Sequence, residues 1–173
     1  MQQLLQPTHR VRDPIYGYIW LTESELNIID TPIFQRLRRI GQLALTKYVY
    51  PTAEHSRFVH SLGVLQAATN MFEEVLRFNP ELREAGEDHL RQDLQLLRFA
   101  ALLHDIGHMP FSHAAEQFFL GKGYSHEDIG KHIILYCPEI ANEIKKQDVS
   151  PNAVANLLKG KQTRSLAFLK KFI

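Results

Sequence analysis

The stretch "RFAALLHDIGHMPFSH", residues 98–113, decides the fold because it joins an apolar helix to a group of ligand-type side chains. Residues 99–103 are all apolar, which is typical of a helix buried in a protein core. Four polar residues follow at once: His104, Asp105, His108 and His113. An unpaired carboxylate at the end of such a helix is costly unless something compensates its charge. The pattern therefore predicts that the end of this core helix forms one wall of a metal site.

The adjacent pair His104 and Asp105 supplies two of the predicted metal ligands. On a regular helix the two side chains point ~100° apart, but at the last turn both can converge on an ion beyond the helix end. The third ligand must come from another segment, and His60 in "HSRFVHSLG" (residues 55–63) is the best candidate. A lone histidine on an apolar helix is more often a hydrogen-bonded core residue, and the consecutive His-Asp pair argues against that alternative. We expect a divalent metal cofactor, with Mn, Fe, Zn, Ni and Mg all left open.

Helical periodicity and capping signals on both sides of this stretch predict an all-α fold. Thr22 and Glu25 form a capping box, and Pro32 is placed for the first turn of a helix. Residues 11–21 are β-branched and aromatic around a Pro and Gly break, which predicts a short β element near the N-terminus. The predicted helices span residues 22–29, 32–42, 56–78, 92–104, 125–136 and 151–158, another starts at residue 138, residues 80–91 form a surface loop or short helix, and residues 163–173 have helical propensity.

Composition excludes several classes of function. The 173 residues are 45% hydrophobic and 23% charged, which is ordinary for a globular domain with a core. A net charge of +1 gives no support to nucleic-acid or membrane binding. Cys137 is the only cysteine, so the sequence holds neither an internal disulfide nor a thiolate zinc site. We find no apolar run of ~20 residues and no signal-peptide core, and we expect a cytoplasmic location.

Five motifs stand in order along the chain: "RDPIYGYIWL" (12–21), "IIDTPIFQRLRRIGQL" (28–43), "YPTAEHSRFVHSLGV" (50–64), "LLHDIGHMPFSH" (102–113) and "YSHEDIG" (124–130). Together they resemble the HD-domain phosphohydrolase superfamily, and within it the deoxynucleoside triphosphate triphosphohydrolase branch. The resemblance implies an HD-domain helical bundle and metal-dependent hydrolysis of deoxynucleoside triphosphates to deoxynucleoside and triphosphate. His60, His104 and Asp105 match three of the four family metal ligands.

The fourth family ligand is an aspartate in a segment similar to "DADRxDYLxRD", and the sequence contains no such segment. We therefore expect residues 1–173 to form a single HD domain that is the N-terminal part of a longer enzyme, with a family member that departs from the pattern at its C-terminus as the alternative. The source of a fourth ligand stays open.

The resemblance also assigns catalytic roles to residues outside the metal group. It implies that His126 donates a proton to the leaving ribose oxygen, and that Glu116 orients His126. His108 and His113 would contact the phosphates. The alternative for His126 is an exposed histidine just after the Ser125 helix cap. Four further histidines lack such a context and are expected at the surface or in packing: His9, His55, His89 and His132.

The resemblance implies that three residues bind the substrate. Arg57 lies one helical turn before His60, and its guanidinium would hold phosphate oxygens. Gln42 would meet the 3′-hydroxyl, and Leu43 would help to exclude a 2′-hydroxyl, which makes the substrate a deoxynucleotide. The alternative for Arg57 is a surface arginine on a helix.

Asp30, Gln35 and Arg38 match positions that bind an activating guanine nucleotide at subunit contacts in some relatives. The alternative is that Asp30 caps a helix before Pro32, while Gln35 and Arg38 occupy an ordinary amphipathic face. We expect a homo-oligomer, with a guanine nucleotide as its candidate activator.

Two other functions remain open at this point. One is an HD phosphohydrolase that acts on another nucleotide phosphoester. The other is an inactive nucleotide-binding or oligomerisation module that lacks the fourth metal ligand. The identity of the products distinguishes a phosphohydrolase of another phosphoester from a triphosphohydrolase. The metal content of the protein distinguishes the inactive module from an enzyme.

Overall fold

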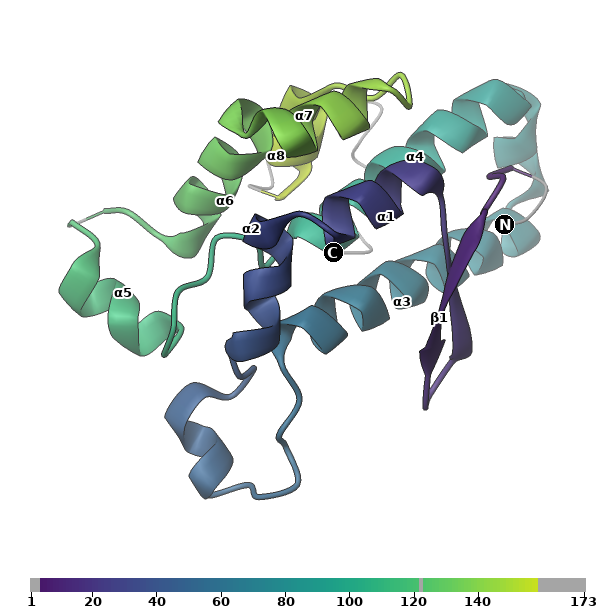
Figure 1. Cartoon of the computed structure of the whole chain (residues 1–173). Helices are drawn as coiled ribbons and strands as arrows, with labels where there is room; N and C mark the ends of the chain where they lie inside the picture. The colour runs from purple at the N-terminus through teal and green to yellow at the C-terminus, as the bar shows by residue number, and fades with distance from the viewer. Residues whose placement is uncertain (1–3, 122, 159–173) are drawn as a thin grey trace.

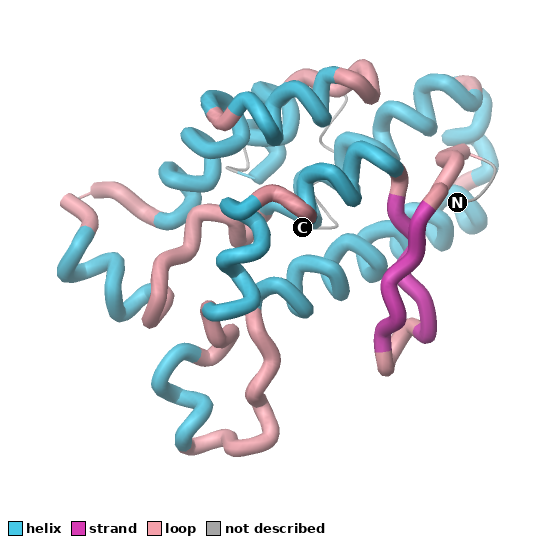
Figure 2. Tube along the Cα trace, viewed as in Figure 1, coloured by secondary structure: helices cyan, strands magenta, loops and turns pink. Residues whose placement is uncertain are grey.

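The computed structural model describes residues 4–121 and 123–158, and it confirms the predicted all-α fold with a short N-terminal β element (Figure 1). Strands in the described residues are confined to one hairpin, as Figure 2 shows. The helical propensity of residues 163–173 lies outside the described residues. In chain order the elements are β1 (His9–Asp13), β2 (Gly17–Leu21), α1 (Glu23–Ile29), α2 (Pro32–Gln35), η1 (Arg36–Arg39), η2 (Ala44–Tyr48), α3 (Arg57–Phe78), η3 (Pro80–Ala85), α4 (Glu87–Leu103), α5 (His113–Phe119), α6 (His126–Tyr136), α7 (Pro138–Lys145) and α8 (Pro151–Leu158).

The N-terminal β element is an antiparallel hairpin. Its register pairs His9 with Leu21 and Asp13 with Gly17. The Asp13 carboxylate accepts hydrogen bonds from the backbone N–H groups of Ile15 and Tyr16, both at 2.9 Å, and Gly17 adopts φ +75°. The turn therefore depends on an aspartate cap and on a glycine where other residues would be strained.

Helices α3 and α4 pack side by side and form the centre of the core (Figure 1). Every residue of α4 from 94 to 103 is buried, which is the environment that the apolar run at 99–103 predicts. Helices α6 and α8 pack against each other, and α8 also packs on α4. Helix α4 is thus packed by α3 and by α8. No helix among the described residues is both long and apolar enough to cross a membrane.

A buried charge network ties the hairpin and α1 to the two central helices. The predicted capping box is present, since Thr22 and Glu25 bond each other's backbone N–H groups. Glu25 also accepts two hydrogen bonds from Arg98 of α4, each at 2.7 Å, and both side chains are at most 1% exposed. Arg98 donates further to Thr69 of α3 and to the Trp20 carbonyl. A fully buried pair of this kind is stable because each remaining donor and acceptor finds a partner.

The predicted helix at residues 32–42 is wrong in its second half. The chain turns from α2 into the tighter η1 and leaves the helix at Ile40, which has extended dihedrals. The Ile40 carbonyl accepts from the Arg57 N–H at 2.8 Å, and the Gln42 N–H donates to the His55 carbonyl at 3.0 Å. Pairing with the segment before α3 therefore overrides the local helical preference.

Other boundaries differ less. Helix α4 begins at Glu87, earlier than the predicted residue 92. The segment before it, predicted as a surface loop or a short helix, contains the short helix η3. The sequence pattern did not predict η2 or α5. Both are short and lie in segments with exposed aromatic residues such as Tyr48 and Phe118.

Candidate metal centre and histidine pair

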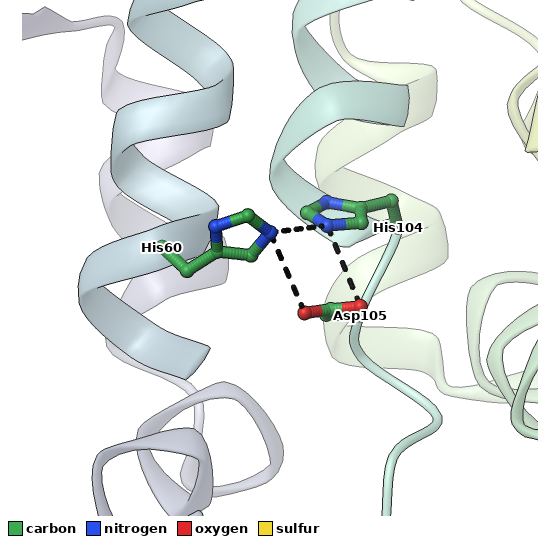
Figure 3. Close-up of side chains that lie close together, drawn as sticks. All are labelled: His60, His104 and Asp105. Atoms are coloured by element: carbon green, nitrogen blue, oxygen red, sulfur yellow. Dashed lines mark hydrogen bonds and ion pairs between the residues drawn. The ribbon is translucent and has the colours of Figure 1, made fainter. Parts of the chain in front are cut away.

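The fold brings the three predicted metal ligands together (Figure 3). His60 lies in the first turn of α3, His104 follows the last residue of α4, and Asp105 comes next in the chain. The Nε2 atoms of His60 and His104 are 3.2 Å apart. The Asp105 carboxylate lies 3.4 Å from His104 Nε2 and 3.9 Å from His60 Nε2. Two nitrogen donors and one carboxylate thus converge on one point between α3 and α4.

The donor atoms fit a divalent metal ion. His104 Nδ1 lies 2.8 Å from the Ala101 carbonyl oxygen, which can only accept, so Nδ1 carries the proton. Nε2 therefore presents a lone pair toward the site, as a ligand histidine must. Metal–nitrogen bonds of about 2.1 Å at angles between octahedral and tetrahedral would separate two nitrogens by roughly 3.0–3.4 Å. The 3.2 Å separation of the two Nε2 atoms agrees with this spacing.

The charge state of the site suits metal ligation as well. Burial alone raises the pKa of the Asp105 carboxyl. The hydrogen bond with His108 and the charges of His104 and Arg57 outweigh burial and hold this pKa far below its ordinary value. Burial, followed by the charge of His104, lowers the pKa of His60. Asp105 is therefore a carboxylate and His60 a neutral imidazole at neutral pH, which are the forms that bind metals.

A second titratable group adjoins the first and consists of His108, Glu116 and His126. The His108 and His126 rings stack with centroids 3.8 Å apart and planes 14° apart. His126 Nδ1 lies 2.9 Å from Glu116 Oε1, so the carboxylate orients this ring. His108 Nε2 lies 3.4 Å from Asp105 and links the two groups. Burial lowers the pKa of His108, which keeps its ring neutral beside the Asp105 carboxylate at neutral pH.

The chain geometry around the second group depends on a close approach between two glycines. Gly107, in the turn after α4, lies against the first turns of α6, where a Cβ would collide with the backbone of His126 and Gly130. Ser125, the helix cap expected from the sequence, forms a capping box with Asp128 at the start of α6. His126 is therefore the first residue of a capped helix. The absence of a Cβ at Gly107 lets this helix start pack directly on the turn that carries His108.

Arg57 is buried, so the alternative of a surface arginine is wrong. Its guanidinium donates to Asp105 Oδ2 at 2.6 Å, and the two side chains are 5% and 7% exposed. Nε and Nη2 both donate to Ser112 Oγ, at 3.2 and 2.9 Å. Phe111 and Ser112 have positive φ angles of 67° and 50°, a conformation that costs free energy in residues other than glycine. The sequence offered no signal that Ser112 would be a partner of Arg57.

The other predicted substrate residues lie in the loop between η1 and η2. Gln42 is half-buried, and its side-chain oxygen is buried without a hydrogen-bond partner among the described residues. Leu43 is half-buried at the start of η2. The backbone of Gln42 is tied to the segment before α3 through its bond to the His55 carbonyl. The side chain of His113, at the start of α5, lies outside what the structure describes.

Asp30, Gln35 and Arg38 line one cavity of about 300 Å³ between the hairpin, α1 and α3. Gln35 accepts from Arg38 Nε at 2.6 Å and donates to the Ile29 carbonyl at 2.8 Å. The Arg38 guanidinium lies 3.6 Å above the Phe58 ring centroid. The three residues therefore share a common hollow, in which neighbouring contacts hold the side chains of Gln35 and Arg38.

The chain is similar to several known proteins. The profile of the HD domain family matches residues 57–167. The chain is 46% identical over 121 residues to the uncharacterized protein MJ1154 of Methanocaldococcus jannaschii, which covers 70% of this chain and 23% of that protein. It is 38% identical over 162 residues to the uncharacterized protein YwfO of Bacillus subtilis, which covers 90% of this chain and 35% of that protein.

A third relative carries a functional name. The chain is 44% identical over 110 residues to the human deoxynucleoside triphosphate triphosphohydrolase SAMHD1, which covers 64% of this chain and 17% of that protein. The chain thus spans between 17% and 35% of the length of these three relatives.

Proposed function

Because the chain belongs to the HD domain family, we propose that it takes part in metal-dependent hydrolysis of deoxynucleoside triphosphates to deoxynucleoside and triphosphate. The observation that carries the proposal is the convergence of His60, His104 and Asp105 beside the stacked rings of His108 and His126. The similarity to SAMHD1 supports a deoxynucleoside triphosphate as the substrate.

The residues divide the chemistry between them. A divalent ion held by His60, His104 and Asp105 would polarise a phosphoryl oxygen and lower the pKa of water. In the reaction, water adds to the α-phosphorus, the bond to the 5′-oxygen breaks, and His126 protonates that leaving oxygen. Glu116, 2.9 Å from His126 Nδ1, orients the ring, and Nε2 is proposed as the proton-donating atom.

Arg57 is proposed to bind substrate phosphate from its place beside the metal carboxylate. The described contacts use three of its N–H groups, two on Ser112 and one on Asp105. A guanidinium has five N–H donors, so two remain for phosphate oxygens. Gln42 brings a buried side-chain oxygen that needs a donor, and a sugar hydroxyl would supply one. His108 and His113 are proposed as further phosphate contacts.

We also propose that a guanine nucleotide binds in the cavity of Asp30, Gln35 and Arg38 and acts as an activator of a homo-oligomer. The cavity of about 300 Å³ supplies a carboxylate that can accept from a guanine edge and a guanidinium that can donate to phosphate. An increase in turnover of dATP on addition of GTP, lost in Arg38→Ala, would support this regulation. Equal rates with and without GTP would exclude it.

Product analysis tests the proposed reaction. The protein is incubated with each deoxynucleoside triphosphate and Mn²⁺, and nucleosides are resolved by chromatography while ³¹P NMR identifies the phosphates. Deoxynucleoside with tripolyphosphate supports the proposal, whereas orthophosphate would indicate an HD phosphohydrolase of another type. Binding of dGTP by metal-free protein without turnover would indicate a binding module.

Matched variants assign the roles. His126→Gln is expected to lower kcat by about 100-fold or more, because it removes the proton donor and leaves the metal ligands in place. His132→Gln, on the same helix and in contact with Tyr136 instead, is the control and should keep activity. His104→Ala should lose the metal, measured by elemental analysis after dialysis, and turnover with it.

A further inference from the structure

Arg36 contacts the backbone of the turn that carries His108. It is the first residue of η1, 70 or more positions away in the sequence, and its side chain is half-buried. Nη1 donates to the His108 carbonyl and Nη2 donates to the Ile106 carbonyl. The two terminal nitrogens of one guanidinium thus bond two carbonyls that flank Gly107.

The opposite side of the same turn is held by α6. Gly107 lies so close to the backbone of His126 and Gly130 that a Cβ could not be accommodated there. The turn is therefore clamped between η1 and the start of α6. The side chain of His108 extends from this turn and stacks on the His126 ring, with ring centroids 3.8 Å apart.

We propose that Arg36 is a positioning residue, which holds the turn 106–108 against α6 so that the His108 and His126 rings stay stacked beside the metal ligands. The effect of Arg36 on catalysis rests on the proposed function. Its effect on the order of the turn 106–108 does not depend on that function.

The arginine side chain is specifically suited to this task. A guanidinium is planar and presents its N–H groups in a fixed fork, so it can bond two carbonyls that face the same way. A lysine ammonium keeps the charge but offers a single nitrogen on a flexible stem. Arg39, three positions later in the same η1 helix, is exposed, and among the described residues it makes no hydrogen bond or ion pair with the turn. Arg39 therefore serves as the matched control.

The catalytic consequence is tested by steady-state kinetics with chemical rescue. Arg36→Ala should lower kcat by about 100-fold, because small misplacement of catalytic groups is costly. KM should rise much less, because the proposed substrate contacts of Arg57 and Gln42 lie outside this turn. Millimolar guanidinium, far below denaturing concentrations, should restore part of the kcat of Arg36→Ala. Arg39→Ala should match the unmodified protein and show no rescue. Metal content should stay unchanged, since His60, His104 and Asp105 are untouched.

Hydrogen exchange tests the geometric claim without any substrate. The amides of Ile106 and His108 donate to the carbonyls of Leu103 and Asp105, each at 3.1 Å, so they report the order of the turn. In Arg36→Ala these amides should exchange about 10-fold faster relative to the core amides of α4, which report global stability. Arg36→Lys serves the same test if Arg36→Ala does not fold.

The two readouts separate the two ideas. Faster exchange in the turn with no turnover in any protein would retain the positioning role and reject the proposed reaction. Unchanged exchange in Arg36→Ala would overturn the positioning role even if the enzyme is active. A fall in kcat that guanidinium does not rescue, with unchanged exchange, would also overturn it.

Discussion

Replacing Arg57 with methionine should destabilise the metal-free protein strongly and the metal-loaded protein much less. In the fold, Arg57 Nη1 lies 2.6 Å from Asp105 Oδ2, and neither side chain is more than 7% exposed. Removing one partner of a buried ion pair leaves the other charge uncompensated and costs about 3–5 kcal/mol. Methionine retains most of the aliphatic volume, so packing loss is small. We therefore expect the free energy of unfolding to fall by about 3 kcal/mol in EDTA.

A divalent ion at Asp105 changes this result, because it supplies the positive charge that the variant lacks. Manganese should therefore stabilise Arg57→Met more than it stabilises the unmodified protein, on top of the ordinary mass-action effect of any ligand. The assay is urea unfolding followed by circular dichroism, with and without Mn²⁺. Arg57→Lys is the second variant, since it keeps the charge if Arg57→Met does not fold.

The control is Arg77→Met on the same helix. Arg77 forms an ion pair with Glu74 at 2.6 Å, but the two side chains are 65% and 55% exposed. Exposed pairs contribute little, so this change should stay within about 0.5 kcal/mol. A cost below about 1 kcal/mol for Arg57→Met in EDTA would refute the role of the buried ion pair. Equal stabilisation of both proteins by Mn²⁺ would refute charge compensation by the metal.

Three further outcomes follow from other parts of the fold. Gly107→Ala should lower the free energy of unfolding by about 3 kcal/mol or more, because the added Cβ meets the backbone of α6. Gly63→Ala in α3 is the control and should stabilise the protein, because its Cβ meets nothing within 4 Å. Equal urea unfolding midpoints for the two variants would contradict this. Glu25→Gln should cost about 3 kcal/mol in urea unfolding by leaving Arg98 buried without its carboxylate, and a loss below about 1 kcal/mol would argue against the pair. Burial lowers the pKa of His60, so the unfolded chain binds more protons than the fold below about pH 6.5, and the metal-free protein should lose stability on acidification. A urea midpoint in EDTA that stays flat or rises from about pH 7 to about pH 5 would refute that sign.

The helices that the sequence predicted well are those with their own local signals. The capping boxes at Thr22 and Ser125 fix the starts of α1 and α6, and the apolar run at 99–103 fixes the buried end of α4. The segment 36–42 was predicted as helix on the same kind of signal and is not one beyond Arg39. Its backbone bonds to residues 55–57 instead, and such pairing is visible only once the chain is folded.

The candidate site shows the same division. Residue types and spacing selected His60, His104 and Asp105, and the fold places their donor atoms together. The ion pair of Arg57 with Asp105, its bonds to Ser112 and the hydrogen bonds of Arg36 to the turn 106–108 had no signal in the sequence. Each of these contacts joins segments about 50 or more residues apart, as the partners' numbers show.

The sequence by itself determined the fold class, the core helix and the identity of the groups that can bind a metal. These features depend on the chemistry of each residue and on periodicity within one helix, and both are encoded by residues that are close together in the sequence. Only the tertiary structure decided which charged groups form ion pairs, which rings stack and which turn is held in place. Those properties depend on distances between α3, α4, α6 and η1, and packing of the whole core sets these distances.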